Sequence, residues 1–455
     1  PGHPGRRSHR PGAARLAQDL DQLEWLIDNT YAYAARRGVD YRAALDAVRT
    51  SLTDETDVGT FAVQLMKVLA LFGDGHTRVG GSAGYLAPGY APFVMRGFGG
   101  RIVALRPGGG LLDAHHPFLH AMDGVPIERW FDAARLLAPK GSPQLEAETA
   151  LWRLHFVGHA RRELGLQSDG ELALVLASAD GKTTVRRLPL APQPAFAPPP
   201  GGPTRVLDGG LGYLRIADMD DDPRALAAMR EAMVRFRDTK GLVIDVRGNG
   251  GGSRDVLRTL FPYFMAPDDK PRLANVAAYR MPPGTPPGRP GGYLEDRFLY
   301  PLTSSLWTDA ERTLLEGLRF EPEWKPPADA FSAWHYLVLR REAGQGLYHY
   351  DRPVVVLMDG GCFSATDIFL AALKGWRGVT LMGTPSGGGS GRTQTTELRH
   401  SKVPVRLSSM ASFRPDGTLY DGAGIEPDVL LEPTVGDVAG TTDTVLDRAL
   451  DHLRE

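Results

Sequence analysis

Two short blocks of this sequence each join an apolar run to small, turn-forming residues and then to a helical pattern. The first is Gly-Leu-Val-Ile-Asp-Val-Arg-Gly-Asn-Gly-Gly-Gly at 241–252, and the second is Cys-Phe-Ser-Ala-Thr-Asp at 362–367. The apolar runs Leu242–Val246 and Val354–Met358 predict two buried parallel strands, each followed by a helix. Open α/β folds place their chemistry at such corners, beyond the carboxyl ends of the strands. The sequence therefore predicts an α/β core with a site at these corners.

The two corners together contain the groups that acyl transfer needs. Ser364 lies at the start of the second predicted helix, where its hydroxyl is a candidate nucleophile. The backbone N–H groups of Gly250 or Gly251 and of Ala365 are candidates for an oxyanion hole, since glycine allows close backbone approach. A serine at a helix start is also a common N-cap, and a glycine-rich corner can hold phosphate. No P-loop Lys-Ser/Thr pair follows these glycines, which disfavours nucleotide binding.

These blocks resemble the motifs of the S41 family of serine peptidases, of the carboxyl-terminal processing and tricorn-core type. The first block matches Asp-x-Arg-x-Asn-x-Gly-Gly at 245–252, and the second matches Ser-Ala-x-(Glu/Asp) at 364–367. Three further segments match in the expected order: Gly73–Thr77, Gly212–Ile216 and Gly424–Asp428. The resemblance implies a crotonase/ClpP-like α/β core of ββα units and peptide-bond hydrolysis through an acyl-enzyme. It implies no cofactor and no metal.

The resemblance also implies a base for the serine. The processing-protease branch has a lysine at the position that Gly389 occupies here, so the lysine dyad is absent. The tricorn-like branch uses a histidine, which corresponds to His76. A histidine just after a helix can also act as a C-terminal cap. That branch has a serine immediately before its histidine, and this chain has Gly75 there, which leaves a triad at most.

A third group is needed to orient the imidazole and to stabilise its charged form. The tricorn-like pattern has a glutamate three residues before the glycine of the late motif. Counting back from Gly424 gives Asp421, a shorter carboxylate. Glu426 is the alternative third residue, and Asp428 also competes for the role.

Composition along the chain predicts four parts. Residues 1–14 lack periodicity and predict a disordered lead-in, and apolar residues at helical spacing predict an N-terminal helical subdomain over 15–92. Short strands and turns over 93–200 predict a β-rich, weakly PDZ-like subdomain that ends in a Pro-rich linker. The catalytic core spans 201–455 and contains an insertion at 266–350 that is rich in proline, glycine and aromatic residues. A lid over the substrate and an oligomer contact are alternative interpretations of this insertion.

Charge and cysteine content exclude several classes of protein. The 52 basic and 54 acidic residues give a net charge of −2 without long single-sign blocks, which argues against nucleic acid as a partner. We find no apolar stretch long enough for an integral membrane segment. The single cysteine, Cys362, excludes an internal disulfide and a cysteine-based metal site, and it is a rival nucleophile. We expect packing or surface roles rather than metal ligation for His155, His159 and the cluster of His115, His116 and His120.

We therefore expect a serine-type peptidase with a Ser-His-Asp site that acts on a peptide or protein substrate. The alternatives are a crotonase-type acyl-CoA reaction and a catalytically silent module that binds peptides or hydrophobic ligands. The sequence leaves the oligomeric state open. The chain starts with Pro1 rather than methionine, which removal of a secretory leader would explain, as would trimming of the chain. A secreted or periplasmic location is favoured over a cytoplasmic one.

Overall fold

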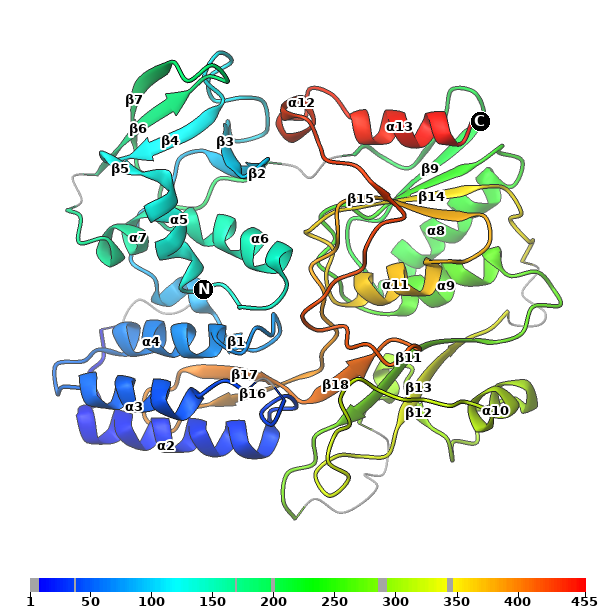
Figure 1. Cartoon of the computed structure of the whole chain (residues 1–455), viewed down its shortest axis with the longest axis horizontal. Helices are drawn as coiled ribbons and strands as arrows, with labels where there is room; N and C mark the ends of the chain where they lie inside the picture. The colour runs from blue at the N-terminus through cyan, green and yellow to red at the C-terminus, as the bar shows by residue number, and fades with distance from the viewer. Residues whose placement is uncertain (1–7, 37, 168–169, 198–200, 285–292, 342–346) are drawn as a thin grey trace.

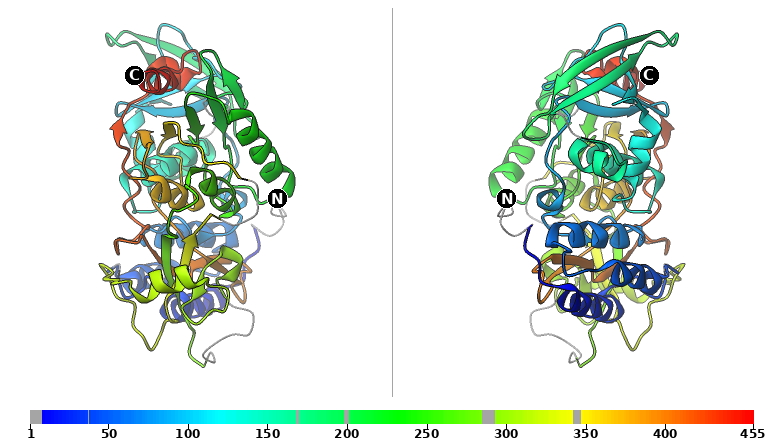
Figure 2. Two further views of the ribbon diagram at one scale, coloured as in Figure 1. Left: turned by 90° about the vertical axis from the view of Figure 1, so that its right-hand side faces the viewer. Right: turned by 90° about the vertical axis from the view of Figure 1, so that its left-hand side faces the viewer.

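The computed structural model has four parts, two above and two below in Figure 1. It describes residues 8–36, 38–167, 170–197, 201–284, 293–341 and 347–455. The β-rich subdomain and the α/β core form the upper half, and the N-terminal helices and the insertion form the lower half (Figures 1 and 2). No helix of these described residues is both long enough and apolar enough to span a bilayer.

The α/β core is built on a six-stranded sheet in the order β19-β15-β14-β10-β9-β8. Its strands are β8 (Arg205–Leu207), β9 (Leu211–Arg215), β10 (Leu242–Asp245), β14 (Val354–Met358), β15 (Val379–Gly383) and β19 (Val429–Leu430). Strand β10 pairs in parallel with both β9 and β14. The two strands predicted from the sequence are thus neighbours, and their carboxyl ends place the two corners side by side.

Both faces of this sheet are covered, which explains the continuous apolar runs of its central strands. Helices α8 (Pro223–Phe236), α9 (Asp255–Phe264) and α11 (Ala365–Leu373) lie on one face, and α13 (Thr444–His452) lies on the other (Figure 1). Along β10, Ile244 packs in the core with α11, whereas Val243 packs in a separate cluster with α13. Alternate residues of one strand therefore fill two different cores.

The N-terminal part contains the three helices that the apolar spacing predicts. They are α2 (Ala13–Thr30), α3 (Tyr41–Ser51) and α4 (Val58–Ala70). Helix α2 begins inside the predicted lead-in, and the carbonyl of His9 accepts a hydrogen bond from the N–H of Val58. Residues 8–14 are therefore held against the helices, in contrast to the disorder predicted for them. Residues 1–7 lie outside the described residues.

These helices pack on a three-stranded sheet to which the catalytic core contributes two strands. The sheet has the order β1-β17-β16 and is formed by β1 (Arg78–Val79), β16 (Thr393–Glu397) and β17 (Pro404–Ser408). A short 3-10 helix, η1 (Ser82–Tyr85), follows β1. The pairing of β1 with β17 is antiparallel and holds the segment just after His76 against the core.

The β-rich subdomain is a meander accompanied by three helices. Its strands are β2 (Val94–Phe98), β3 (Arg101–Leu105), β4 (Phe118–Met122), β5 (Val125–Pro126), β6 (Glu171–Ala177) and β7 (Thr183–Pro189), and its helices are α5 (Ile127–Arg135), α6 (Pro143–Leu154) and α7 (Val157–Glu163). A cleft of about 1890 Å³ separates this subdomain from the core and from α12 (Val435–Ala439). Part of the predicted Pro-rich linker, residues 198–200, lies outside the described residues.

The insertion forms a packed layer of the fold. Its elements are β11 (Arg272–Tyr279), η2 (Glu295–Arg297), β12 (Tyr300–Pro301), α10 (Asp309–Glu316) and β13 (His335–Leu339). Together with β18 (Met410–Phe413) of the core, the strands make a sheet in the order β12-β13-β11-β18. Trp307, Phe331 and Tyr336 are buried in one cluster with the N-terminal helices. The described part of the insertion thus differs from the predicted lid, because its aromatic residues fill a core.

A pair of leucine variants tests whether this layer contributes to stability. Leu337 in β13 is 1% exposed, so Leu337→Ala should lower the free energy of unfolding by about 2–5 kcal/mol. Leu302, also in the insertion, is 37% exposed, and Leu302→Ala should change the free energy of unfolding by no more than about 0.5 kcal/mol. Denaturant unfolding measures both values. If both variants lower the free energy of unfolding by the same small amount, the insertion does not contribute to the hydrophobic core.

Candidate active site

The structure brings Ser364 and His76 together from distant parts of the chain. Ser364 Oγ lies 3.0 Å from His76 Nε2. Ser364 precedes helix α11 and has φ 62° and ψ −117°, a strained conformation for a residue with a side chain. His76 follows the end of α4, where Gly73 adopts φ 64°. The serine turn and the turn after α4 together place the hydroxyl against the imidazole.

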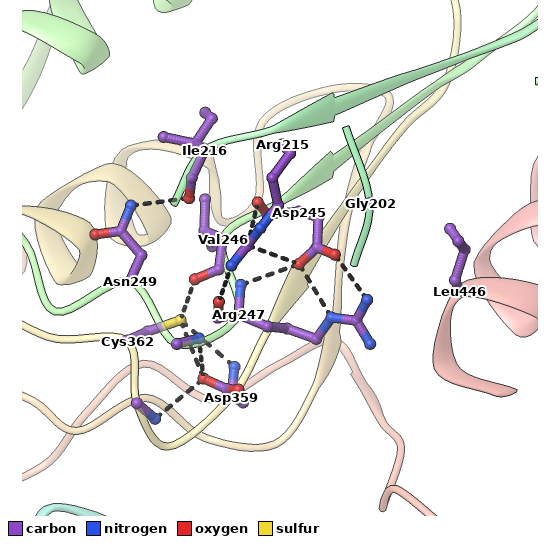
Figure 3. Close-up of polar contacts among 12 residues, drawn as sticks. Gly202, Arg215, Ile216, Asp245, Val246, Arg247, Asn249, Asp359, Cys362 and Leu446 are labelled. Atoms are coloured by element: carbon purple, nitrogen blue, oxygen red, sulfur yellow. Dashed lines mark hydrogen bonds and ion pairs between the residues drawn. The ribbon is translucent and has the colours of Figure 1, made fainter. Parts of the chain in front are cut away.

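Asn249 links the two corners of the core sheet. Its Nδ2 donates to the carbonyl of Ile216 at 3.0 Å (Figure 3). Its Oδ1 accepts from the N–H of Gly251 at 2.9 Å and from the hydroxyl of Thr366 at 2.8 Å. Its own carbonyl accepts from the N–H of Phe363 at 3.0 Å. One fully buried side chain therefore fixes the end of β9, the glycine corner and the serine turn relative to one another.

This arrangement corrects the predicted role of Gly251. Its N–H donates to Asn249, so it is not available to an oxyanion. Gly251 is needed here because it has no side chain: a Cβ at this position would lie 2.7 Å from Ser364 Cβ. The N–H groups of Gly250 and Ala365 have no acceptor among the described residues, and the space around Gly250 is open. These two N–H groups remain the candidates for the oxyanion hole.

The aspartate and the arginine of the first corner form a buried ion-pair network (Figure 3). Asp245 accepts from Arg247 Nε at 3.0 Å and from Arg247 Nη2 at 2.7 Å. The two Nη atoms of Arg247 also donate to the two carboxylate oxygens of Asp443, each at 2.8 Å. Asp443 immediately precedes α13. Tyr213 on β9 donates to Asp245 at 2.7 Å. The paired geometry satisfies both buried charges, and it fixes the path of the chain into the glycine corner.

Asp367 holds the glycine-rich loop that lies over His76. Its carboxylate accepts from the hydroxyl of Ser386 and from the N–H groups of Gly388 at 3.2 Å and Gly389 at 3.1 Å. Burial raises the pKa of Asp367 to about 7, although these hydrogen bonds act to lower it. The last residue of the Ser-Ala-x-Asp motif therefore shapes the loop rather than reaching the serine hydroxyl.

The ring of Phe363 explains why two positions near the site are glycine. It stacks on His76 with ring centroids 4.7 Å apart. A Cβ at Gly75 would lie 2.6 Å from this ring, and a Cβ at Gly389 would lie 2.4 Å from it. Gly75 and Gly389 are the positions where the resembling branches have serine and lysine. In this chain, the aromatic ring occupies the space that those side chains would need.

Two carboxylates lie beside the imidazole. Asp74 is fully buried, accepts from the N–H of His76 at 2.9 Å, and lies 3.8 Å from His76 Nδ1. Asp421 is 5% exposed and accepts from the hydroxyl of Tyr33 at 2.7 Å. Ligand atoms of Asp74, His76 and Asp421 all lie within 4.8 Å of one another. His76 Nδ1 has no hydrogen-bond partner among the described residues, so neither carboxylate forms a hydrogen bond with it.

The structure separates the candidates for the third group. Glu426 is exposed, and its backbone carbonyl accepts from Lys374 Nζ. Asp428 pairs with the same lysine at 3.1 Å. Neither is brought to His76, whereas Asp421 is. Sequence reasoning missed the positions of Asp74 and Tyr33 beside this site, although Asp74 lies within the Gly-Asp-Gly-His-Thr segment.

The set of Asp74, His76 and Asp421 has a spacing that could hold a metal ion. His76 Nε2 faces the serine hydroxyl, and the second oxygen of Asp74 accepts from Thr77 at 2.7 Å. These contacts engage one ring nitrogen of His76 and one oxygen of Asp74 within the protein. The buried His155 bonds backbone groups through both ring nitrogens, at 3.0 and 3.2 Å, which is a packing role.

Burial lowers the pKa of His76 to about 4, so the imidazole is neutral near pH 7. The charge of Asp74 acts in the opposite direction, and the charges of Arg297, Arg78 and Arg406 lower the pKa further. Cys362 is fully buried, and burial raises the pKa of its thiol well above the ordinary value. The thiol donates to the carbonyl of Val246 at 3.1 Å. A buried, protonated thiol is a poor nucleophile, which disfavours the Cys362 alternative.

Comparisons with known proteins show which sequences and folds this chain resembles. Residues 210–431 match the model of peptidase family S41. The carboxy-terminal-processing protease of Bartonella bacilliformis is 36% identical over 95 residues, which cover 21% of this chain and 22% of that protein. The match thus spans less than a quarter of that relative's length.

The whole fold resembles solved structures at low sequence identity. Mature CPAF has a TM-score of 0.68 at 18% identity, with 97% of this chain and 98% of that chain covered. A structure from Parabacteroides merdae has a TM-score of 0.52 at 17% identity, with 98% and 97% covered. These likenesses confirm the predicted α/β fold class, and they concern the fold alone.

The low pKa of His76 is directly measurable. An NMR titration of the imidazole should give a midpoint near 4, instead of the ordinary value of about 6.5. Asp74→Asn should lower the midpoint further, and Arg297→Gln should raise it. Because the unfolded chain binds this proton at higher pH, the contribution of His76 to stability is present above about pH 6.5 and is lost as the pH falls towards 4. A midpoint above 6 would contradict the buried geometry.

Proposed function

We propose that this chain, whose residues 210–431 match the model of peptidase family S41, is a serine-type peptidase that hydrolyses peptide bonds through an acyl-enzyme. The main support for this proposal is the distance of 3.0 Å between Ser364 Oγ and His76 Nε2. A hydroxyl becomes a useful nucleophile only next to a base, and this base is neutral at physiological pH. The substrate is a peptide or protein.

In the acylation step, Ser364 Oγ attacks the scissile carbonyl carbon while its proton moves to His76 Nε2. The carbonyl oxygen becomes an oxyanion, which accepts hydrogen bonds from the N–H groups of Ala365 and Gly250. Ala365 is the first residue of helix α11, so the positive end of the helix dipole also faces this charge. The C–N bond then breaks, and His76 returns the proton to the leaving nitrogen.

In the deacylation step, a water molecule takes the place of the leaving amine. The oxygen of the water attacks the ester while His76 Nε2 accepts a proton from the water. His76 then donates this proton to Ser364 Oγ as the ester bond breaks. The product acid leaves, and the free enzyme is restored. The imidazole is charged in both transition states. Asp74 and Asp421 stabilise that charge, because one carboxylate oxygen of each lies within 4.8 Å of a ring nitrogen.

The second candidate function is a catalytically silent module that binds peptides or hydrophobic ligands. The strained backbone of Ser364 favours the peptidase, since strain at a residue with a side chain has to be maintained by the surrounding structure. A secreted or periplasmic location stays a prediction.

Covalent labelling distinguishes these two functions. A fluorophosphonate probe should label the purified protein at Ser364, and Ser364→Ala should abolish labelling and lower kcat by at least about 10³-fold. Cys362→Ala is the matched control, because it changes a buried neighbour without touching the hydroxyl. It should retain labelling. A folded wild-type protein that neither reacts with the probe nor cleaves peptides would support the binding module.

The third group can be assigned with two amide variants. Asp421→Asn removes a charge next to His76 and should lower kcat by at least about a hundredfold, with KM little changed. Glu426→Gln changes an exposed side chain and should cost less than about tenfold. Steady-state kinetics of both folded variants give the ranking. The reverse order would remove Asp421 from the proposed triad.

A further inference from the structure

Tyr33 brings a hydroxyl from the N-terminal part of the chain into the candidate active site. Its side chain is fully buried, and its hydroxyl donates to Asp421 Oδ2 at 2.7 Å. A hydrogen bond to a charged carboxylate is stronger than one between two neutral groups. Because Asp421 is the proposed third group, this contact joins the N-terminal part to the catalytic residues.

Two donors act on the same oxygen of Asp421. Besides the tyrosine hydroxyl, the N–H of Ser390 donates to Oδ2 at 3.4 Å. The other oxygen, Oδ1, lies beside the glycine-rich loop, because a Cβ at Gly389 would lie 3.4 Å from it. The terminal torsion of an aspartate has broad energy minima, so hydrogen bonds rather than rotamer preference set the orientation of the carboxylate. The two donors on Oδ2 therefore also fix where Oδ1 lies.

Asp74, the other carboxylate beside the imidazole, is oriented within its own turn. One of its oxygens accepts from the N–H of His76 at 2.9 Å, and the other accepts from the hydroxyl of Thr77 at 2.7 Å. These donors lie two and three residues further along the chain. In contrast, Tyr33 is separated from Asp421 by 388 positions. The orientation of Asp421 thus depends on tertiary structure that Asp74 does not need.

The backbone around Tyr33 is held on both sides. Tyr33 follows α2, and the N–H of the preceding residue, Ala32, donates to the carbonyl of Ser408 in β17 at 2.7 Å. The carbonyl of Tyr33 accepts from the N–H of Arg36 at 3.0 Å. These bonds fix the turn to a strand of the core, so the phenol ring enters the site from a defined position.

The insertion supports this turn and the ring that it carries. Trp324 contacts Tyr33 with ring centroids 6.1 Å apart, within the range of aromatic pairs. The neighbouring Glu323 accepts from Arg36 Nη2 at 2.8 Å and from the N–H of Leu419 at 3.4 Å. Glu323 thus links the turn of the N-terminal part to the segment that leads into the third group. The described part of the insertion therefore reaches the site through a tyrosine rather than through a lid.

We propose that Tyr33 is a positioning residue of the peptidase reaction, which acts by orienting the carboxylate of Asp421 towards His76. The imidazole is positively charged in both proposed transition states, and the interaction of two charges weakens as their distance grows. A carboxylate without the tyrosine hydrogen bond would rotate and hold Oδ1 less firmly beside the ring. Tyr33 itself contacts neither the substrate nor the reacting atoms. This inference rests on the proposed function and names a residue through which the N-terminal part controls the same site.

The rate of fluorophosphonate labelling tests this role without a known peptide substrate. Tyr33→Phe removes one oxygen and keeps the buried ring. It should lower the second-order rate constant for labelling of Ser364 by about tenfold or more, because hydrogen bonds to charged groups are strong. Tyr41→Phe is the matched control, since Tyr41 also donates to an aspartate, Asp28, in a pair that involves no residue of the candidate site. It should react at the wild-type rate. A folded Tyr33→Phe protein that also reacts at that rate would overturn the proposal.

A double variant separates the positioning of Asp421 from a general loss of structure. Asp421→Asn alone should lower the labelling rate by at least about a hundredfold. Adding Tyr33→Phe to it should cost less than about a further twofold, because the group that Tyr33 positions no longer contributes. Independent effects would instead multiply to about a thousandfold. Such multiplication would mean that Tyr33 acts by a route other than Asp421, contrary to the proposal.

NMR of the His76 imidazole gives a readout that needs no reaction. Its resonances are identified by their loss in His76→Ala. Tyr33→Phe should shift them, because the nearby carboxylate changes its orientation, whereas Tyr41→Phe should leave them in place. Unchanged resonances in folded Tyr33→Phe would contradict the proposal.

Trp324→Ala changes the support of the tyrosine ring and serves as a second variant if thermal unfolding shows that Tyr33→Phe is not folded. It should shift the same His76 resonances and slow labelling by at least about twofold, a modest effect because a single aromatic pair is weak. That loss should also disappear in the Asp421→Asn background. A Trp324→Ala protein with wild-type resonances and a wild-type labelling rate would count against the role of Tyr33.

Failure of the positioning role and failure of the proposed function give different results. If wild-type Ser364 reacts with the probe and Tyr33→Phe reacts equally fast, the peptidase stands and the positioning role is wrong. If the wild-type protein does not react, the proposed function is wrong, and the positioning role is wrong with it. If Asp421→Asn reacts as fast as the wild type, the third group lies elsewhere and Tyr33 has no catalytic carboxylate to position.

Discussion

The hydrogen bonds of Asn249 are the constraint on which the site depends. Its amide joins the end of β9 to the glycine corner and to Thr366 at the start of α11, and its carbonyl holds Phe363. The turn at Ser364 is strained, and strain of this kind costs about 1–3 kcal/mol. Buried hydrogen bonds on both sides of the turn offset that cost. Without them, the serine would relax, and its hydroxyl would lose its fixed direction towards His76.

The sequence was sufficient to predict the two central strands, the corners that follow them and the side chains of Ser364 and His76 that meet in the candidate site. Strand β14 is apolar throughout, and β10 is apolar from Leu242 to Ile244, because both faces of the sheet are covered, and such runs are readable from sequence. The meeting of Ser364 with His76 followed from the resemblance in motif order. The prediction for Gly251 was wrong, because the partner of a backbone N–H depends on where a distant side chain folds. The same limit concealed Tyr33, which donates to Asp421 across 388 residues of sequence.

The insertion shows a second limit of sequence reasoning. A stretch rich in proline, glycine and aromatic residues is typical of a surface segment, and β11 and β13 lack any strong local signal that they form a central layer. Their sheet is completed by β18, which lies far along the chain, so burial of Trp307 and Tyr336 arises from tertiary packing.

The role of Phe363 also depends on tertiary packing and could not be predicted from the sequence. Its ring stacks on His76 and fills the space above Gly75 and Gly389, so the two departures from the resembling pattern at these positions have one steric cause.

The electrostatics of the site set the charge state of its imidazole. The charge of Asp74 favours the charged form of His76, whereas burial and the charges of Arg297, Arg78 and Arg406 favour the neutral form. Burial has the largest effect, so the imidazole is neutral near pH 7. A neutral imidazole can accept a proton, but its lowered pKa makes it a weaker base than an ordinary histidine. In the proposed function the imidazole is charged in both transition states, and the buried carboxylate of Asp74 is then a group that offsets this charge.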